Sequence, residues 1–398
     1  MTSGAMTVDP DLDASDYLER ARALVPLIDS EAEEAERTRT VTDKVAHALR
    51  ESGLPWMLVP KRLGGGGLRI AECIEVCETI AAADTSVGWI LQAYTWGGGL
   101  HAGLLPHSGA EQLFGSGDRK IVCGAFGPPG RATLVDGGLQ VTGHWNFGSG
   151  AKHADYIGGG VMVHDADGTL LHNPDGSPEM RFAIMPKDQV ALEGNWTVSG
   201  LVGTDSQDYS ADGVIVSEDM VADVSPGAEP HQPDGMYRMG SMYNFTVAGH
   251  ASMALGLMRR ALHEVAKLTE GKQRLGYPGP VDQYPVFLSE FATHEATYQA
   301  ARGYILTAFR QAQDYADREG SLAPELASRV RQASTWAHQI AGPIVDFARV
   351  WAGTKGFREP SPLARVGRDV AVAVTHVQVD PITLVESAPA LLDSWKKI

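Results

Sequence analysis

The sequence predicts an α+β protein that is mainly helical, in which a helical first part and a helical last part enclose a β-rich middle. Apolar residues follow a helical period from Ser15 to about Gly115, and the period returns after Gly240. Between these two parts the chain has short alternating segments separated by turn residues. Strands bracketed by helical runs, rather than alternating with them, argue against a doubly wound parallel sheet. We expect domains at residues 1–118, 119–232 and 233–398.

The first part contains several helices joined by recognisable caps and loops. Tyr17, Ala21, Leu24 and Ile28 form one apolar stripe, and a further helix is expected from Arg69 to Ala83. Between them, the run from Gly64 to Gly67 marks a loop. The sequence Asp84-Thr85-Ser86 indicates a cap that opens an apolar helix from Val87 to Tyr94.

The middle part has the pattern of a β-domain. The segments Arg131 to Leu134 and Leu139 to Phe147 flank the turn Asp136-Gly137-Gly138, which predicts a hairpin. Further strands are expected at Tyr156 to Val163, Arg181 to Pro186 and Asp212 to Val216. In the last part, apolar residues recur at steps of four and three and begin a long helical domain: Ala251, Leu255, Met258, Leu262 and Val265.

Composition excludes several classes of function. The chain has 33 Lys plus Arg against 49 Asp plus Glu, a formal net charge of −16, which disfavours nucleic-acid binding. No apolar run reaches about 18 residues, and Met1 to Pro10 lacks a signal segment, so we expect no membrane association and a cytoplasmic protein. Cys73 and Cys77 lie four apart on a helical pattern and are expected in the core. No Cys or His cluster has zinc spacing around them, so no metal is expected.

The most informative segment runs from Val135 to Gly150, where a strand ends in an aromatic pair and a turn of small residues. Alternation places Trp145 and Phe147 on one face, while Gly148, Ser149 and Gly150 allow backbone and a hydroxyl to approach a planar ligand. This arrangement suits an isoalloxazine ring. A core tryptophan beside a glycine turn explains the same pattern and stays open.

This segment resembles the β-domain of acyl-CoA-dehydrogenase-like proteins, especially their flavin-dependent monooxygenase branch. Four further segments resemble the family in the same order: Val59-Pro60 with Gly64 to Gly67, Asp84 to Trp89, Trp196 with Ser199 to Ser206, and Ser361 to Arg365 with Arg368-Asp369. The resemblance spans nearly the whole chain. It implies the acyl-CoA dehydrogenase fold: an N-terminal helical domain, a central β-barrel-like domain and a C-terminal four-helix bundle, usually in a homotetramer.

The resemblance also implies a flavin site between the last two domains. Ser149 is expected near the flavin N5, and the cofactor is expected to contact a further set of residues: Trp145, Phe147, Gly150, Thr204 and Ser206. Arg274 follows the first bundle helix, where the family often binds a cofactor phosphate, and a helix-end cation explains it equally well. Gly353 and Gly356 match a turn near the cofactor of a neighbouring subunit, and a helix cap is the alternative.

The candidate acid and base separate a dehydrogenase from a monooxygenase. A dehydrogenase needs a carboxylate to remove the α-proton of its thioester substrate. No carboxylate follows Arg368-Asp369 as far as Val377, and Thr246 and Val247 occupy the alternative position. The segment after Arg368-Asp369 contains His376 instead. The resemblance implies that His376 acts as an acid or base near the flavin, and it makes His101 a second candidate for this role. For either histidine a purely structural role is the alternative.

We therefore expect the oxygenase component of a two-component monooxygenase. No Gly-x-Gly-x-x-Gly motif lies between a strand and a helix, so reduced FMN or FAD is expected from a separate NAD(P)H:flavin reductase. With O2 as co-substrate, a flavin C4a-hydroperoxide would pass one oxygen atom to a small aromatic or heteroatom-containing molecule. The alternatives are an acyl-CoA dehydrogenase or related flavin oxidase, and a non-catalytic scaffold with the same fold.

Overall fold

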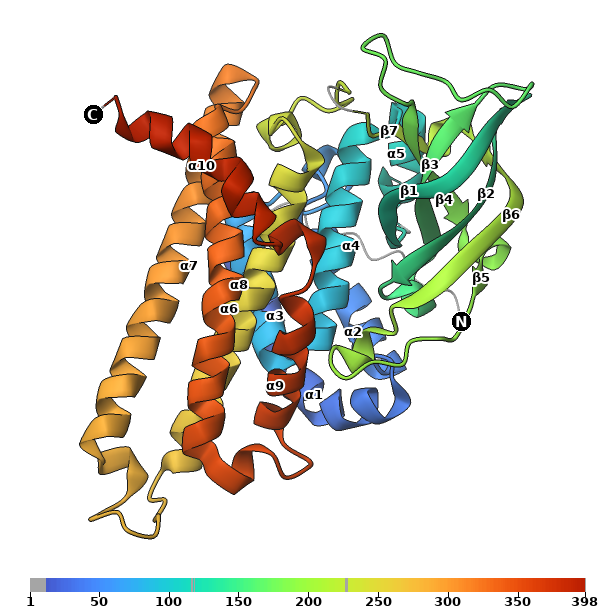
Figure 1. Ribbon diagram of the computed structural model, residues 1–398. Coiled ribbons are helices and arrows are strands. Elements are labelled where there is room, and N and C mark those ends of the chain that lie inside the picture. The colour runs from blue at the N-terminus through green and yellow to red at the C-terminus, as the bar shows by residue number, and fades with distance from the viewer. Residues whose placement is uncertain (1–11, 116, 118, 226–227, 398) are drawn as a thin grey trace.

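The computed structural model describes residues 12–115, 117, 119–225 and 228–397. The predicted order of helices, strands and helices is confirmed. Figure 1 shows the sheet packed on one side of the helices, with helix α4 between the sheet and the long C-terminal helices. The segment Met1 to Pro10 and the predicted domain limit at residue 118 lie outside the described residues, and the limits themselves stay predictions. None of the described helices is long and apolar enough to cross a membrane.

Among the described residues, the first part of the chain has five α-helices. They are α1 (Ala14–Thr38), α2 (Asp43–Ser52), α3 (Ile70–Ala83), α4 (Thr85–Leu104) and α5 (His107–Ala110). The predicted cap of α4 is confirmed, because the Asp84 carboxylate accepts the backbone N–H of Val87 at 3.1 Å. Cys73 and Cys77 are fully buried in the core, as expected.

The middle part is a mixed sheet of seven strands. The strands are β1 (Val122–Val135), β2 (Gly138–Gly148), β3 (Tyr156–His164), β4 (Met180–Pro186), β5 (Ala191–Leu192), β6 (Gln207–Ser217) and β7 (Val221–Asp223). Their order in the sheet is β5-β6-β2-β1-β3-β4-β7. The predicted hairpin is confirmed by the antiparallel pairing of β1 with β2, whereas β1 and β3 run parallel.

The last part consists of three long helices and two shorter ones. They are α6 (Met242–Thr269), α7 (Pro285–Glu319), α8 (Pro324–Ala352), α9 (Pro362–Ala373) and α10 (Ile382–Trp395). Helix α6 lies at the centre, packed against α3, α4, α8 and α9. Its first half is almost entirely buried, because it contacts other helices on nearly every side. This position brings residues of α6 to the junction of all three parts.

The expectation that Trp145 and Phe147 share a face is wrong. Trp145 is fully buried within the β-domain, where its indole N–H donates to the carbonyl of Gly160 at 2.9 Å and its ring stacks on Tyr209. Phe147 adopts φ +68° and is 66% exposed. The pairing of β2 with β6 also shifts register between Trp145 and Gly148. The strand therefore loses its alternation at the two residues where the prediction relied on it.

Candidate active site

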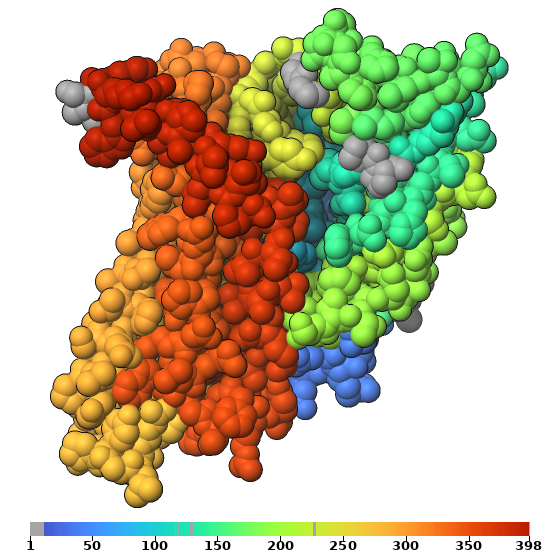
Figure 2. Space-filling view, viewed as in Figure 1, coloured from blue at the N-terminus to red at the C-terminus, as the bar shows by residue number. Residues whose placement is uncertain are grey.

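A cavity of about 530 Å³ lies where the β-domain, α4, α6 and the segment after α9 meet. Figure 2 shows a hollow in the surface between the sheet and the C-terminal helices, with α4 at its floor. Most of the wall is aromatic or apolar, as in sites for small organic ligands. The polar side chains that line it are Gln92, His101, Asn146, Ser149, Thr204, Ser206, Tyr243, Thr246, His250, Thr375, His376 and Gln378.

A chain of hydroxyl groups forms the β-domain side of the cavity. The Thr204 hydroxyl donates to the carbonyl of Leu201 at 2.8 Å, so it can only accept from Ser206, whose Oγ lies 2.7 Å away. The Ser206 oxygen in turn accepts from Ser149, at 2.7 Å. Ser149 Oγ also accepts the indole N–H of Trp89 at 3.2 Å. Only the Ser149 proton can therefore turn toward a ligand while the rest of the chain keeps its bonds.

Two histidines form the helical side of the cavity. The rings of His250 on α6 and His376 after α9 stack with their centroids 3.9 Å apart. The Trp89 ring meets both edge-on, at 5.3 Å from His250 and 5.8 Å from His376. Because its indole N–H reaches Ser149, Trp89 joins the hydroxyl chain to the histidine pair. His338 on α8 lies behind His250, with the ring centroids 6.5 Å apart.

The tautomer of His376 follows from its backbone contact. His376 caps the short 3₁₀ helix Val377–Val379, and its Nδ1 accepts the backbone N–H of Gln378 at 3.3 Å. In the neutral ring the proton is therefore on Nε2, which is the nitrogen left free for a ligand. Burial, with a smaller contribution from His338, lowers the pKa of His376 to about 4. At neutral pH this histidine is an uncharged hydrogen-bond donor.

His101 lines the cavity from the last turns of α4. It stacks on Phe182 at 4.8 Å and on Phe126 at 6.0 Å, and it is almost fully buried. Burial in these aromatic surroundings lowers the pKa of His101 to about 3. The side chain is therefore neutral, and it suits hydrogen bonding better than proton uptake.

No Asp, Glu, Lys or Arg is among the described residues that line the cavity. Asp369, the carboxylate that directly follows Arg368, is buried on α9 outside the cavity. Its Oδ1 accepts the backbone N–H of Leu201 at 2.7 Å, and burial followed by the nearby Asp84 raises its pKa to about 7. Asp369 thus holds the loop that carries Thr204 and does not face the cavity.

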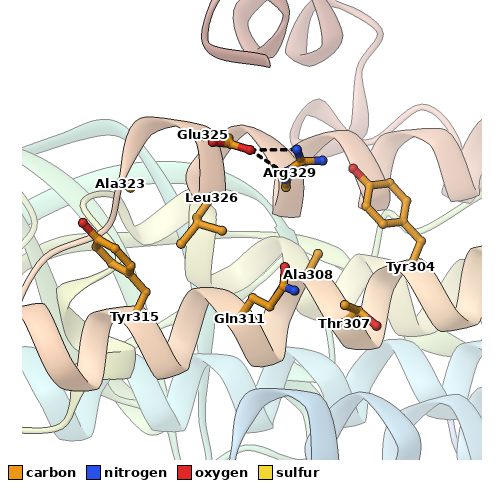
Figure 3. Close-up of a pocket in the computed structure, with 9 residues that line it drawn as sticks. All are labelled: Tyr304, Thr307, Ala308, Gln311, Tyr315, Ala323, Glu325, Leu326 and Arg329. Carbon is orange, nitrogen blue, oxygen red and sulfur yellow. Dashed lines mark hydrogen bonds and ion pairs between the residues drawn. The ribbon is translucent and has the colours of Figure 1, made fainter. Parts of the chain in front are cut away.

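A second hollow lies between α7 and α8, near the turn that joins them (Figure 3). Its wall is formed by Tyr304, Gln311 and Tyr315 on α7 and by Leu326 and the ion pair of Glu325 with Arg329 on α8. It is an open groove without the combination of hydroxyls and histidines seen in the cavity. The cavity between the β-domain and α6 is therefore the candidate active site.

Comparison with known proteins agrees with this geometry. Residues 18–112 match the family model described as "Acyl-CoA dehydrogenase, N-terminal domain", and residues 248–381 match "Acyl-CoA dehydrogenase, C-terminal domain". Together the two matches span more than half of the chain. The chain belongs to the acyl-CoA dehydrogenase family.

Relatives place the chain in the monooxygenase branch of this family. It is 28% identical over 351 residues to indole-3-acetate monooxygenase from Pseudomonas putida, covering 88% of this chain and 87% of the relative. It is 25% identical to the oxygenase component of FADH2-dependent resorcinol hydroxylase from Rhizobium sp. (strain MTP-10005), covering 92% and 90%. The fold matches the structure of TdsC from Paenibacillus sp. A11-2 with FMN and indole, with a TM-score of 0.80, 20% identity and coverage of 95% and 96%. The predicted enzyme class, a monooxygenase, is confirmed.

The structure brings together some of the residues predicted from the sequence. Lining the one cavity are Phe147, Ser149, Thr204, Ser206, His101 and His376. Gly150 lies behind it with φ +74°; its carbonyl accepts the Tyr94 hydroxyl and its N–H donates to Thr204. Trp145 belongs to the core of the β-domain and does not line the cavity, which corrects its expected cofactor contact.

The predicted phosphate and neighbour-subunit residues lie away from the cavity in this chain. Arg274 donates to the carbonyls of Val350 and Trp351 at the end of α8, and its guanidinium lies over the Trp351 ring. Gly353, with φ +59°, is next to this contact, and Gly356 follows in the same turn. The expected cofactor contacts of Arg274, Gly353 and Gly356 stay predictions.

Sequence reasoning missed Trp89, Gln92 and His250 as site residues. Trp89 appeared only as part of a family segment, although its indole joins the two polar sides of the cavity. Gln92 is the one amide in the apolar first half of α4, and such a buried polar residue was the available signal. His250 carries no such signal, because nothing in the sequence of α6 indicates that it stacks on His376.

Proposed function

We propose that the chain is the oxygenase component of a two-component monooxygenase, which takes reduced FMN or FAD from a separate NAD(P)H:flavin reductase. It uses O2 to place one oxygen atom on a small aromatic or heteroatom-containing substrate. The observation that carries the proposal is a cavity with hydroxyls on one side, two stacked histidines on the other and no carboxylate among its described residues. A dehydrogenase would need such a carboxylate as its base.

The residues of the cavity fit a flavin ring. Loop residues from the β-domain supply a hydroxyl at Ser149, a half-exposed aromatic ring at Trp196 and the exposed ring of Phe147, which lies edge-on to Trp196. Ser149, Thr204 and Ser206 would hold the polar edge of the cofactor. When bound, the reduced flavin supplies the electrons that activate O2. Arg274, Gly353 and Gly356 would serve the cofactor of a neighbouring subunit.

The chain's own groups supply protons and exclude charge. The Ser149 hydroxyl can turn away from Ser206 and donate a hydrogen bond toward the cofactor side of the cavity, while Ser206 still donates to Thr204 and Thr204 to Leu201. The Nε2–H of His376 can donate to an oxygen atom or to the substrate on the opposite side. His101 offers a third neutral hydrogen-bonding group at the aromatic end. The uncharged and largely apolar wall favours oxygen transfer to an organic ring over release of peroxide to water.

A homotetramer in the cytoplasm is part of the proposal. Helix α10 presents an apolar stripe that one chain leaves exposed, formed by Ile382, Val385, Leu392 and Trp395. Burial of such a stripe in a symmetric assembly would stabilise that assembly. All three cysteines are free thiols, which agrees with a reducing compartment.

The reductant tests this function. The purified chain should not oxidise NADH or NADPH at a useful rate, and it should form an oxygenated product once a flavin reductase and NADH are added. Fast NADH oxidation by the isolated chain would contradict the two-component proposal. Desaturation of an acyl-CoA, detected by mass spectrometry, would support the dehydrogenase alternative.

A further inference from the structure

Three buried polar side chains in the cavity have no hydrogen-bond partner among the described residues. Gln92 is 7% exposed, His101 is 2% exposed and His250 is 4% exposed, and all three line the cavity. The Nδ1 atoms of His101 and His250 are fully enclosed and unpaired. Buried polar groups are nearly always bonded, and each one left unpaired costs about 1–3 kcal/mol. Neither the Gln92 amide nor the Nε2 atom of either histidine is enclosed in this way, and none of them has a partner among the described residues, so these are the atoms that can face a ligand.

Gln92 and His250 line the same cavity where α4 packs against α6. A Cβ atom placed on Gly249 would stand 2.2 Å from Gln92 Oε1, so the amide rests against the α6 backbone one residue before His250. Gly249 is what permits this approach. The His250 ring is fixed by its stacking on His376 and by the edge of Trp89. The two side chains are therefore held in place from opposite helices.

Together these side chains offer both donors and acceptors. The Gln92 amide has an NH2 group and a carbonyl oxygen, and a neutral imidazole has one donor and one acceptor nitrogen. They complement a group that donates, accepts or does both, such as a hydroxyl or an aromatic N–H. The neighbouring Trp89 and Trp96 rings line the same wall and suit an aromatic ligand.

The surroundings of His250 contain no permanent charge among the described cavity residues. The titratable groups that face it or share the cavity are His101 on α4, Cys123 on β1, Tyr243 on α6, His338 on α8 and His376 after α9. Burial, followed by the nearby His376 and His338, lowers the pKa of His250 well below its usual range. A carboxylate bound there would lack a cation, or would have to bring a proton onto a histidine.

We propose that Gln92 and His250 form the subsite that binds the polar group of the substrate, and that this group is uncharged, either a phenolic hydroxyl or an aromatic N–H. The inference rests on the proposed function, because it places the ring to be oxygenated between this subsite and the Ser149 side of the cavity. The proposal distinguishes this chain from an enzyme that binds its substrate through a carboxylate group of the substrate.

The test measures binding under anaerobic conditions with reduced FMN present, so that no turnover occurs. The probes are resorcinol, indole, 1-methylindole, which lacks the N–H, and indole-3-acetate, which adds a carboxylate. Titration calorimetry from about pH 6.5 to about pH 8.5 should show resorcinol or indole binding with a pH-independent Kd. Indole-3-acetate should bind more weakly than indole, and its Kd should rise about tenfold per pH unit if a histidine takes up a proton. 1-Methylindole should bind about tenfold or more weakly than indole wherever indole binds.

Variants assign the effect to the two residues. His250→Phe should weaken binding of the preferred uncharged probe by about 10- to 100-fold, and Gln92→Met, which keeps the side-chain length, should weaken it about tenfold. His338→Asn is the matched control, because His338 is buried in the same cluster of histidines but does not line the cavity. The Kd of this variant for the same probe should stay within about twofold of the parent value. If His250→Phe fails to fold, Gln92→Met decides the result on its own.

Three results with the parent protein would overturn the proposal. They are equal binding of indole and 1-methylindole, tighter binding of indole-3-acetate with a pH-independent Kd, and no binding of either resorcinol or indole. A fourth is an unchanged Kd in a folded Gln92→Met variant. A protein that binds these probes as expected but forms no oxygenated product with a reductase would refute the proposed monooxygenase function, and the subsite would stand.

Discussion

The substitution His376→Asn separates a role in oxygenation from a role in folding. Asparagine can still accept the N–H of Gln378 and cap the 3₁₀ helix that follows, because its side chain is a good N-cap. Its amide can donate a hydrogen bond toward the cavity but cannot exchange a proton. The variant therefore keeps the helix cap and removes the imidazole, with its Nε2–H and its stacking on His250.

The expected magnitudes of the two effects differ. Loss of ring stacking on His250 should lower the free energy of unfolding by about 0.5–1.5 kcal/mol. Loss of the positioned Nε2–H donor should lower the rate of product formation by ~10²-fold or more, which corresponds to at least about 2.7 kcal/mol of transition-state free energy. Since the parent His376 has a pKa near 4, its neutral form dominates, and the parent rate should show no His376 ionisation between about pH 6 and about pH 9.

Three assays read these effects separately. Anaerobic titration measures affinity for reduced flavin, thermal unfolding measures stability, and product and peroxide are measured per reduced flavin consumed. The variant should bind reduced flavin normally and release most of its oxidising equivalents as hydrogen peroxide. A folded His376→Asn protein that binds flavin and forms product at the parent rate would refute the assigned role, leaving Ser149 and His101 as candidates.

Other parts of the account are tested by single substitutions. Ser149→Ala leaves the Trp89 N–H without an acceptor, so the unfolding free energy should fall by about 1–3 kcal/mol and reduced-flavin affinity should fall with it, by thermal melts and anaerobic titration. In the folded protein the pKa of Asp369 is about 7, above its value in the unfolded chain. Protonation of Asp369 therefore stabilises the fold, and the free energy of unfolding should fall as pH rises from about 4 to about 7. Asp369→Asn keeps an acceptor for the backbone N–H of Leu201, so the free energy of unfolding, measured by denaturant titration, should depend less on pH in this variant. The same pH dependence in variant and parent would contradict the role of Asp369. If the chain assembles as proposed, Trp395→Glu on the exposed stripe of α10 should shift the assembly toward smaller species in light scattering. A parent protein that is monomeric at full flavin affinity would refute the proposed homotetramer.

Much of the fold follows from local signals in the sequence. The cap at Asp84 and the turn at Gly137-Gly138 need only a few adjacent residues, because each is stabilised by contacts within a few positions along the chain. The order of helical and alternating segments is a sum of many such signals. The family resemblance then named the cavity residues Ser149 and His376.

What could not be predicted depends on contacts between distant segments. Strand alternation failed at Phe147 because the backbone turns to positive φ where β2 shifts its register against β6. From the sequence, Trp145 suits a contact with a cofactor and a place in the core equally well. The hydrogen bond from its indole N–H to the carbonyl of Gly160, on the next strand but one, shows that it belongs to the core. Gln92 and His250 are 158 positions apart, and no period within either helix indicates that they line the same cavity.

The central claim is that this chain transfers one atom of O2 to an organic substrate. The direct measurement supplies isotopically labelled O2, a flavin reductase and NADH, and follows the label by mass spectrometry in the product of indole or resorcinol. The account predicts one labelled oxygen atom per product molecule and none without the reductase. Label found only in hydrogen peroxide or water, with no oxygenated product from either compound, would contradict it.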